Sequence, residues 1–383
     1  MLKRLKRIVL IGFVMAFSVS VSLAAITPNP PAPSIAAKSY ILQDFASGRV
    51  LAESNSTQRL PPASITKLMT AYVVSHELAA GNIALDDDVL ISEKAWRMVG
   101  SRSFIEVNTK VSVEVLLRGM IIQSGNDAAV ALAEHIAGSE ETFAQMMNQY
   151  AQKLGMFDTN YRNTTGLPDP DHYTTAKDIA ILSAAAIRDF PDHYEWYAEK
   201  EFTHNGITQH NRNKLLWRDT TVDGLKTGHT EEAGYCLAAS AVRSDMRLIS
   251  VVLGTRSENA RAQETQKLFN YGFRFFETHD LYQAQTKVVD SKVWKGAAKQ
   301  VELGLAKSLA VTVPRGQYKD LVASTNIQQP LVAPIEAGNQ LGQVEIRLGD
   351  EVIAQQALIA LQTVEQGSWW RRLIDSILLL IWG

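Results

Sequence analysis

Ser64 and Lys67 stand three residues apart in a stretch that favours the start of a buried helix. Two prolines precede Ser64, and the apolar residues that follow recur at helical spacing. On a helix this spacing puts the lysine amine and the serine hydroxyl on one face, about one turn apart. Desolvation or a neighbouring cation would lower the pKa of Lys67 until its amine could take the proton of Ser64. The pair is a candidate nucleophile and base, but a surface lysine on a capped helix gives the same pattern.

A second polar group, Ser124-Gly125-Asn126, lies between an apolar run and a helical pattern. Gly125 permits a tight turn there, so Ser124 and Asn126 can project to one side. Their hydroxyl and amide could relay a proton and hold a substrate carbonyl. The same residues are also ordinary turn residues. We interpret Asp127, which follows them, as the N-cap of the next helix.

Lys226-Thr227-Gly228-His229 forms a third group, just before a β-rich run that begins at Tyr235. Gly228 leaves room for a substrate backbone to approach an edge strand closely. Lys226 offers a positive charge and Thr227 a hydroxyl, a pair that suits an anionic chain end. The backbone N–H of His229 could contribute to an oxyanion hole. Taken alone, an exposed Lys-Thr-Gly more often has no catalytic role.

The elements that must position these groups lie between about residue 39 and residue 277. Helical periodicities are mixed there with short β-rich runs, which predicts an α/β or α+β domain. After about residue 288, short alternating runs are broken by prolines and glycines, the pattern of an all-β module. A chain of 383 residues is long enough for two domains, and we place the boundary near Thr286.

The two ends of the chain have patterns of their own. Four basic residues, an apolar run and a small-residue stretch predict a secretory signal peptide at 1–24, with an uncleaved anchor as the alternative. A proline-rich, extended segment follows at 25–38. Near the C-terminus, apolar residues at helical spacing from Trp370 to Trp382 oppose a face that carries Asp375. This helix is too short to span a bilayer, so we expect it to lie in the membrane interface; the alternative is a terminal helix docked on the protein's own core.

Composition narrows the remaining possibilities. The 38 basic and 40 acidic side chains nearly cancel and form no basic block, so nucleic-acid binding is not expected. The single cysteine, Cys236, excludes an intramolecular disulfide and a multi-cysteine metal site, and we interpret it as a small core residue.

The three polar groups occur in the order Ser-x-x-Lys, Ser-x-Asn, Lys-Thr-Gly, which is the signature of penicillin-binding proteins and class A β-lactamases. The chain resembles the low-molecular-mass penicillin-binding proteins of the serine D-alanyl-D-alanine carboxypeptidase family, nearly from end to end. Four longer stretches carry the resemblance: PASITKLMT from Pro62, SGNDAA from Ser124, DGLKTGHT from Asp223 and GFRFFET from Gly272.

The resemblance implies a function that the local patterns leave open. Such an enzyme removes the terminal D-Ala of peptidoglycan stem pentapeptides through an acyl-enzyme, is acylated by β-lactams, and requires no metal or cofactor. Ser64 would be the acylated nucleophile and Lys67 its base. The remaining site residues would be Ser124 and Asn126 as catalytic partners and Lys226, Thr227, Gly228, His229 and Arg261 in substrate binding.

The same resemblance implies an architecture and a place in the cell. The fold would be a transpeptidase-like domain with an antiparallel sheet flanked by helices at 39–286, a β-sandwich at 287–366 and an amphipathic anchor at 367–383. We expect an exported protein on the periplasmic face of the inner membrane. Its partners would be stem peptides, β-lactams and the membrane surface.

Three alternatives share some of these features. A class A β-lactamase would recruit a glutamate downstream of the second group, yet none lies between Glu141 and Glu195. A D,D-endopeptidase that cuts cross-links could use the same residues in a wider cleft. A non-catalytic wall-binding scaffold would be expected to lack one of the principal motif residues, and all are present.

Overall fold

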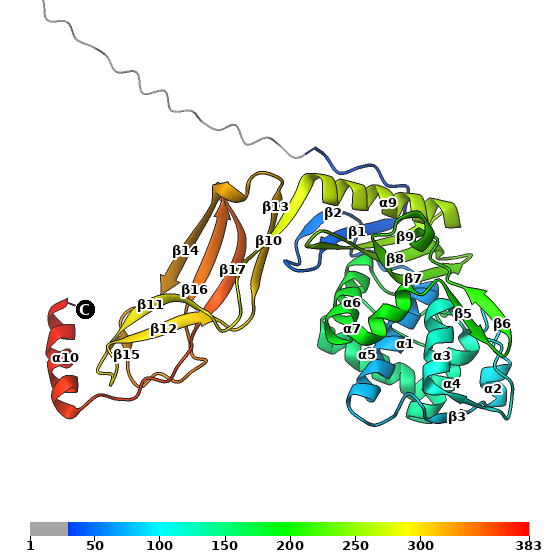
Figure 1. Cartoon of the computed structure of the whole chain (residues 1–383), viewed down its shortest axis with the longest axis horizontal. Coiled ribbons are helices and arrows are strands. Elements are labelled where there is room, and N and C mark those ends of the chain that lie inside the picture. The colour runs from blue at the N-terminus through cyan, green and yellow to red at the C-terminus, as the bar shows by residue number, and fades with distance from the viewer. Residues whose placement is uncertain (1–29, 383) are drawn as a thin grey trace, which may run out of the picture. The chain divides into compact units, whose positions relative to one another are not determined.

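Five antiparallel strands form the central sheet, in the order β2-β1-β9-β8-β7 (Figure 1). The computed structural model describes residues 30–382, so the expected signal peptide lies outside the described residues. The strands are β1 (Ser39–Asp44), β2 (Val50–Ser54), β7 (Val222–Thr230), β8 (Gly234–Arg243) and β9 (Met246–Thr255). Because every pairing in this sheet is antiparallel and helices pack on both faces, the α+β expectation is confirmed.

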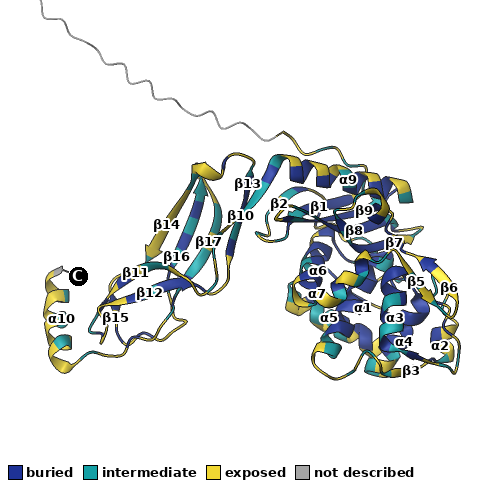
Figure 2. Ribbon diagram, viewed as in Figure 1, coloured by how far each residue is buried: buried dark blue, intermediate teal, exposed yellow. Residues whose placement is uncertain are grey.

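Side chains of β8 alternate between two hydrophobic cores, one on each face of the sheet. Figure 2 shows β8 and β9 as largely buried strands. Ala238 points into the larger core, which the N-terminal helices fill, whereas Leu237 and Ala239 point into the smaller core beneath α9 (Glu258–Phe275). Cys236 is fully buried in the larger core, which confirms its interpretation as a core residue.

The other elements of this part of the chain surround the larger core. The helices are α1 (Lys67–Ala79), α2 (Glu93–Trp96), α3 (Val113–Ile122), α4 (Asn126–Ala137), α5 (Glu140–Leu154), α6 (Ala176–Asp189), α7 (Pro191–Tyr194) and α8 (Leu215–Arg218). Two 3₁₀ turns are η1 (Ala63–Thr66) and η2 (Glu195–Ala198). Two small two-stranded sheets pair β3 (Asp88–Leu90) with β4 (Lys110–Ser112) and β5 (Glu201–His204) with β6 (Ile207–His210).

The C-terminal part is an all-β module with its own core, which includes Val301, Val344 and Leu358. A six-stranded sheet has the order β14-β16-β17-β12-β11-β15, and β10 pairs with β13 in a second sheet. The elements are β10 (Phe276–Tyr282), β11 (Lys287–Trp294), β12 (Gln300–Leu305), β13 (Leu309–Pro314), η3 (Tyr318–Asp320), β14 (Leu321–Ile327), β15 (Leu331–Val332), β16 (Gln340–Leu348) and β17 (Glu351–Ala360). Strand β10 ends before Thr286 but pairs with β13, which follows Thr286. The β module thus includes residues on both sides of the expected boundary, and the boundary near Thr286 stays a prediction.

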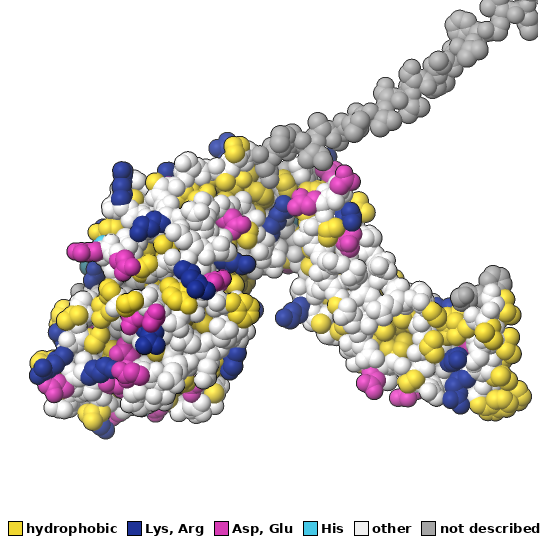
Figure 3. Space-filling model, turned by 180° about the vertical axis from the view of Figure 1, so that it is seen from behind, with side chains coloured by type: hydrophobic (Ala, Val, Ile, Leu, Met, Phe, Trp, Pro, Cys, Tyr) yellow, Lys and Arg dark blue, Asp and Glu magenta, His cyan; other side chains and the backbone are white. Residues whose placement is uncertain are grey.

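The C-terminal helix α10 (Trp369–Trp382) turns its polar side toward the β module. Asp375 accepts a hydrogen bond from the backbone N–H of Lys295, and Arg371 donates to the carbonyls of Ala297 and Ala298 at 3.2 and 3.3 Å. Its apolar side chains are exposed instead (Figure 3): Trp369, Trp370, Leu373, Ile374, Ile377, Leu378, Leu380 and Ile381. The helix is docked, but not by burial of its apolar face. Within residues 30–382, no helix has the length and apolar character needed to cross a bilayer.

Candidate active site

A cleft of about 460 Å³ lies where η1, the start of α4, the loop 163–167 and β7 meet. It brings residues from all three polar groups of the sequence together. Of the expected site residues, Ser64, Ser124, Asn126, Thr227, Gly228, His229 and Arg261 line it. Lys67 and Lys226 lie directly beneath this surface, each almost fully buried.

Lys67 is held by three polar atoms. Its Nζ lies 3.2 Å from Ser64 Oγ and donates to Asn126 Oδ1 at 2.6 Å and to the carbonyl of Thr165 at 2.7 Å. Burial lowers the pKa of Lys67 to about 7, against the carboxylates of Asp127 and Glu140, which raise it. An amine that loses its proton near neutral pH, next to a half-buried serine hydroxyl, can act as that serine's base.

Ser64 lies at the start of the helix that its local pattern indicates. It belongs to the 3₁₀ turn η1, and the α-helix begins only at Lys67. The helix therefore starts where the sequence indicates, but its first turn, which contains Ser64, is a 3₁₀ turn that runs directly into α1. The i, i+3 contact survives because a 3₁₀ turn also brings side chains three residues apart onto one side.

The second polar group joins two helices end to end. Ser124 has a φ of +71° and is buried, and its Oγ has no hydrogen-bond partner among the described residues. The side chain of Asn126 links the segment around Val99 to Lys67 on α1. Its Nδ2 donates to Val99 O at 2.6 Å, and its Oδ1 accepts from Lys67 Nζ. A buried hydroxyl without a partner at the edge of a cleft is free to exchange a proton with a substrate atom.

Asp127 is not the N-cap that its sequence position indicates. Gly125 is the N-cap of α4 and provides no side-chain bond, while Asp127 sits in the first turn of the helix, fully buried. Its carboxylate accepts from the backbone N–H of Ser103 at 2.8 Å and from that of Ala128 at 2.9 Å. Asp127 therefore fixes the wall of the cleft and places a negative charge behind Lys67.

The third polar group forms the edge strand of the sheet, next to η1. A Cβ atom on Gly228 would lie 3.0 Å from Pro62 O and 3.1 Å from the backbone N of Ile65, so glycine favours the close approach of β7 to η1. Lys226 Nζ donates to Thr227 O at 3.2 Å. Burial, and then the charges of Lys67, Arg261 and Arg212, hold the pKa of Lys226 well below its ordinary value. His229 is exposed and stacks on Tyr235, with ring centroids 3.9 Å apart.

Arg261 projects from α9 into the far end of the cleft. It is 4% exposed, donates to Gly228 O at 3.2 Å, and forms an ion pair of 3.6 Å with Glu258. Arg212, from the loop between β6 and α8, also lines the cleft and was not foreseen, because no motif surrounds it. This end of the cleft thus combines two guanidinium groups and a hydroxyl, which suits a carboxylate.

The loop 163–167 is the other part of the cleft that the sequence analysis missed. Thr165, Gly166 and Leu167 line the cleft, and the Thr165 carbonyl is one of the three partners of Lys67. Gly166 has a φ of +82°, and a Cβ there would lie 1.8 Å from Ala63 O. The loop therefore lies against the residue that precedes Ser64. No cluster of three or more metal-binding side chains occurs in the described part of the chain.

Two family models match the chain. Residues 25–257 match the D-alanyl-D-alanine carboxypeptidase peptidase family, and residues 276–366 match the C-terminal domain of penicillin-binding protein 5. The chain is 45% identical over 356 residues to the D-alanyl-D-alanine carboxypeptidase DacC of Escherichia coli, covering 91% of this chain and 89% of DacC. It is 41% identical over 390 residues to DacA of Haemophilus influenzae, covering 100% and 99% of the two chains.

Solved structures agree with these matches. Penicillin-binding protein 5 from Haemophilus influenzae superposes with a TM-score of 0.86 at 43% identity, over 88% of this chain and 100% of that one. Penicillin-binding protein D2 from Listeria monocytogenes, solved in an ampicillin-bound form, covers 64% of this chain and is itself covered completely, with a TM-score of 0.59 at 31% identity.

Proposed function

The chain belongs to the D-alanyl-D-alanine carboxypeptidase family and is a penicillin-binding serine hydrolase, and from this premise we propose the roles of its site residues. Ser64 attacks the carbonyl carbon of the penultimate D-Ala, and Lys67 takes its proton. The bond to the terminal D-Ala breaks, and that residue leaves as free D-alanine. A water molecule that is activated near Lys67 then hydrolyses the ester on Ser64. The contact of 3.2 Å between Lys67 Nζ and Ser64 Oγ supports these steps most directly.

The other groups stabilise charge and move protons. Ser124, with its unpartnered hydroxyl, passes a proton to the departing amine, and Asn126 holds a substrate carbonyl. The backbone N–H groups of Ser64 and His229 face the developing oxyanion, an arrangement favoured by the close packing of β7 on η1 at Gly228. Thr227, Arg261 and the buried Lys226 bind the terminal carboxylate, and Arg212 adds a further positive charge.

A labelled penicillin tests the nucleophile. Intact-protein mass spectrometry should find one adduct per chain, and peptide mapping should place it on Ser64, because a β-lactam acylates the same hydroxyl as the substrate. Ser64→Ala should carry no adduct, while Ser324→Ala, which removes an exposed hydroxyl on β14, should be labelled normally. An adduct that persists in Ser64→Ala would disprove the assignment.

We also propose export and membrane attachment. The proposed segments of the chain are a signal peptide at 1–24, an extended segment at 25–38, the peptidase domain at 39–286, the β-sandwich at 287–366 and the anchor at 367–383. The exposed apolar face of α10 supports the anchor, because a surface of this kind is stable when it enters the headgroup region of a bilayer. In this proposal the enzyme works at the periplasmic face of the inner membrane, on cell-wall peptidoglycan, and thereby affects cell shape.

A further inference from the structure

We propose that Glu140 is a positioning residue for Lys67, which holds the Thr165 carbonyl against the lysine amine and keeps a negative charge behind it. This inference rests on the proposed role of Lys67 as the base. Glu140 itself does not line the cleft and acts only through the loop 163–167 and through its charge.

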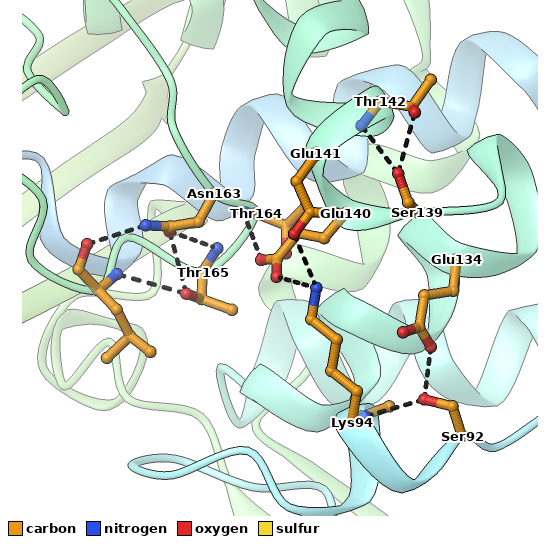
Figure 4. A network of polar contacts seen from close by, with 12 residues as sticks. Ser92, Lys94, Glu134, Ser139, Glu140, Glu141, Thr142, Asn163, Thr164 and Thr165 are labelled. Carbon is orange, nitrogen blue, oxygen red and sulfur yellow. Dashed lines mark hydrogen bonds and ion pairs between the residues drawn. The ribbon is translucent and has the colours of Figure 1, made fainter.

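Glu140 is the first residue of α5 and is only 8% exposed. Its Oε1 accepts from the backbone N–H and the hydroxyl of Thr164 at 3.1 and 2.9 Å, and its Oε2 faces Lys94 Nζ at 3.2 Å (Figure 4). A carboxylate in such a position needs these donors, since a buried charge without partners is strongly destabilising. The contacts therefore fix both the side chain and Thr164.

Thr164 transmits this anchoring to the active site. Its carbonyl accepts from Thr70 Oγ1 at 2.8 Å, so both polar ends of the residue are held. The next carbonyl, that of Thr165, then points at Lys67 Nζ from 2.7 Å. On its outer side the loop is closed by Asn163, which accepts from Gly166 N at 2.7 Å and donates to Leu167 O at 3.0 Å. Glu140 supplies the attachment on the inner side.

Burial lowers the pKa of Lys67, and Glu140 is one of two carboxylates whose negative charges act in the opposite direction. Asp127 on α4 and Glu140 on α5 raise the pKa of Lys67, while Lys226 on β7 lies close enough for the two lysines to repel. Arg102 approaches Asp127 at 3.9 Å, and Lys94 on α2 partly neutralises Glu140. Lys94 is 44% exposed and shared with Glu141, so it compensates Glu140 incompletely.

The variant Glu140→Gln removes the negative charge of this side chain but can keep its hydrogen bonds. Its Oε1 can still accept from Thr164, and Lys94 can turn fully to Glu141, so the loop keeps its attachment while the negative charge disappears. The pKa of Lys67 should then fall, and the neutral amine should form at lower pH. Because acylation needs the neutral amine, the acidic limb of the pH profile should move to lower pH.

The experiment measures the rate of acylation by a fluorescent penicillin between pH 5 and pH 9 in the soluble, folded enzyme. We expect Glu140→Gln to move the acidic limb down by about half a pH unit or more. Glu93→Gln is the matched control, because Glu93 lies beside Lys94 on α2 but is 66% exposed and pairs with Arg97 instead. Its profile should superimpose on that of the unaltered chain. Identical limbs for Glu140→Gln and Glu93→Gln would overturn the proposal.

Lys94→Met provides a second measurement that leaves every bond of the loop intact. Without the ammonium, Glu140 acts on Lys67 uncompensated, so the limb should move to higher pH. A limb that stays in place would contradict the proposal even if Glu140→Gln fails to fold. Lys67→Arg separates this inference from its premise: normal acylation in that variant would refute the base, whereas lost acylation with unshifted limbs in the other variants would refute only Glu140.

Discussion

At the scale of single residues, the site depends on one lysine that is both buried and fixed. Burial favours the neutral amine of Lys67, and two acceptors, Asn126 Oδ1 and Thr165 O, orient it toward Ser64. An exposed lysine would keep its proton at neutral pH and move freely. Fixation and a lowered pKa therefore come from the same packing.

The pH dependence of acylation should report this lysine. Its folded-state pKa of about 7 lies below the ordinary value, so the fraction of neutral amine, and with it the acylation rate, should rise as pH increases through about 7. Lys67→Arg should reduce acylation about 100-fold or more at every pH, since arginine does not surrender its proton. Stopped-flow acylation checks both, with circular dichroism as the folding control. A rate independent of pH between 5 and 8 would exclude Lys67 as the base.

Arg261 should distinguish a free chain end from an amide. Converting the terminal carboxylate of a model stem peptide to its amide should lower kcat/KM tens-fold, about 2 kcal/mol, because a charged hydrogen bond is lost. Arg261→Ala should cause much of the same loss on the acid and add little on the amide.

Arg218→Ala serves as the control for Arg261, because this exposed arginine bonds Asn259 outside the cleft. It should leave the ratio between acid and amide unchanged. Equal cleavage of acid and amide by the unaltered enzyme would instead favour an endopeptidase that reads no chain end.

At the scale of elements, the loop 163–167 and the turn η1 form a single unit. Gly166→Ala introduces a Cβ that would lie 1.8 Å from Ala63 O, next to Ser64. Gly81→Ala is matched to it, because Gly81 has a φ of +71° and a Cβ added there would meet no atom within 4 Å. The control should lose about 1 kcal/mol of unfolding free energy. Gly166→Ala should lose about 2 kcal/mol more and acylate slowly, as urea unfolding and penicillin labelling can establish.

The sequence is informative where chemistry and a local pattern coincide. Ser64 with Lys67, Ser124 with Asn126, and the Lys226 strand each carry their polar residues beside a recognisable helix or strand pattern, and the structure brings all of them to one cleft. Three-residue spacing, a glycine turn and an edge strand are properties of a short segment. They can therefore be read without knowledge of the fold.

Other parts of the site depend on contacts between distant segments and left no such pattern. Arg212 reaches the cleft from an irregular loop, and Thr165 meets Lys67 across 98 positions of the chain. Asp127 has the residue type of an N-cap but instead bonds Ser103, because the preceding glycine takes the cap position. Local propensity indicates what a residue can do, while tertiary packing decides which partner it finds.

At the scale of the whole molecule, α10 should determine where the enzyme works. Deleting residues 368–383 from the mature chain should abolish co-sedimentation with anionic lipid vesicles and leave hydrolysis of a soluble peptide nearly unchanged. Leu373→Glu with Ile377→Glu keeps the helix but charges its exposed face, so this variant should also stay in solution. A truncated chain that still sediments with vesicles would refute the anchor, and one that unfolds would show that α10 stabilises the β module instead.

For the proposed membrane anchor, the polar docking of α10 would also change the thermodynamics of attachment. A free peptide of 14 residues is a marginal helix in water and normally orders only as it partitions into lipid. Here Arg371 and Asp375 hold the helix on the β module before any lipid is present. The conformational entropy that a free peptide loses on forming a helix is thus already lost when the protein folds. Partitioning into lipid would then reflect the transfer of a rigid apolar face, with a strength set by its area rather than by a conformational equilibrium.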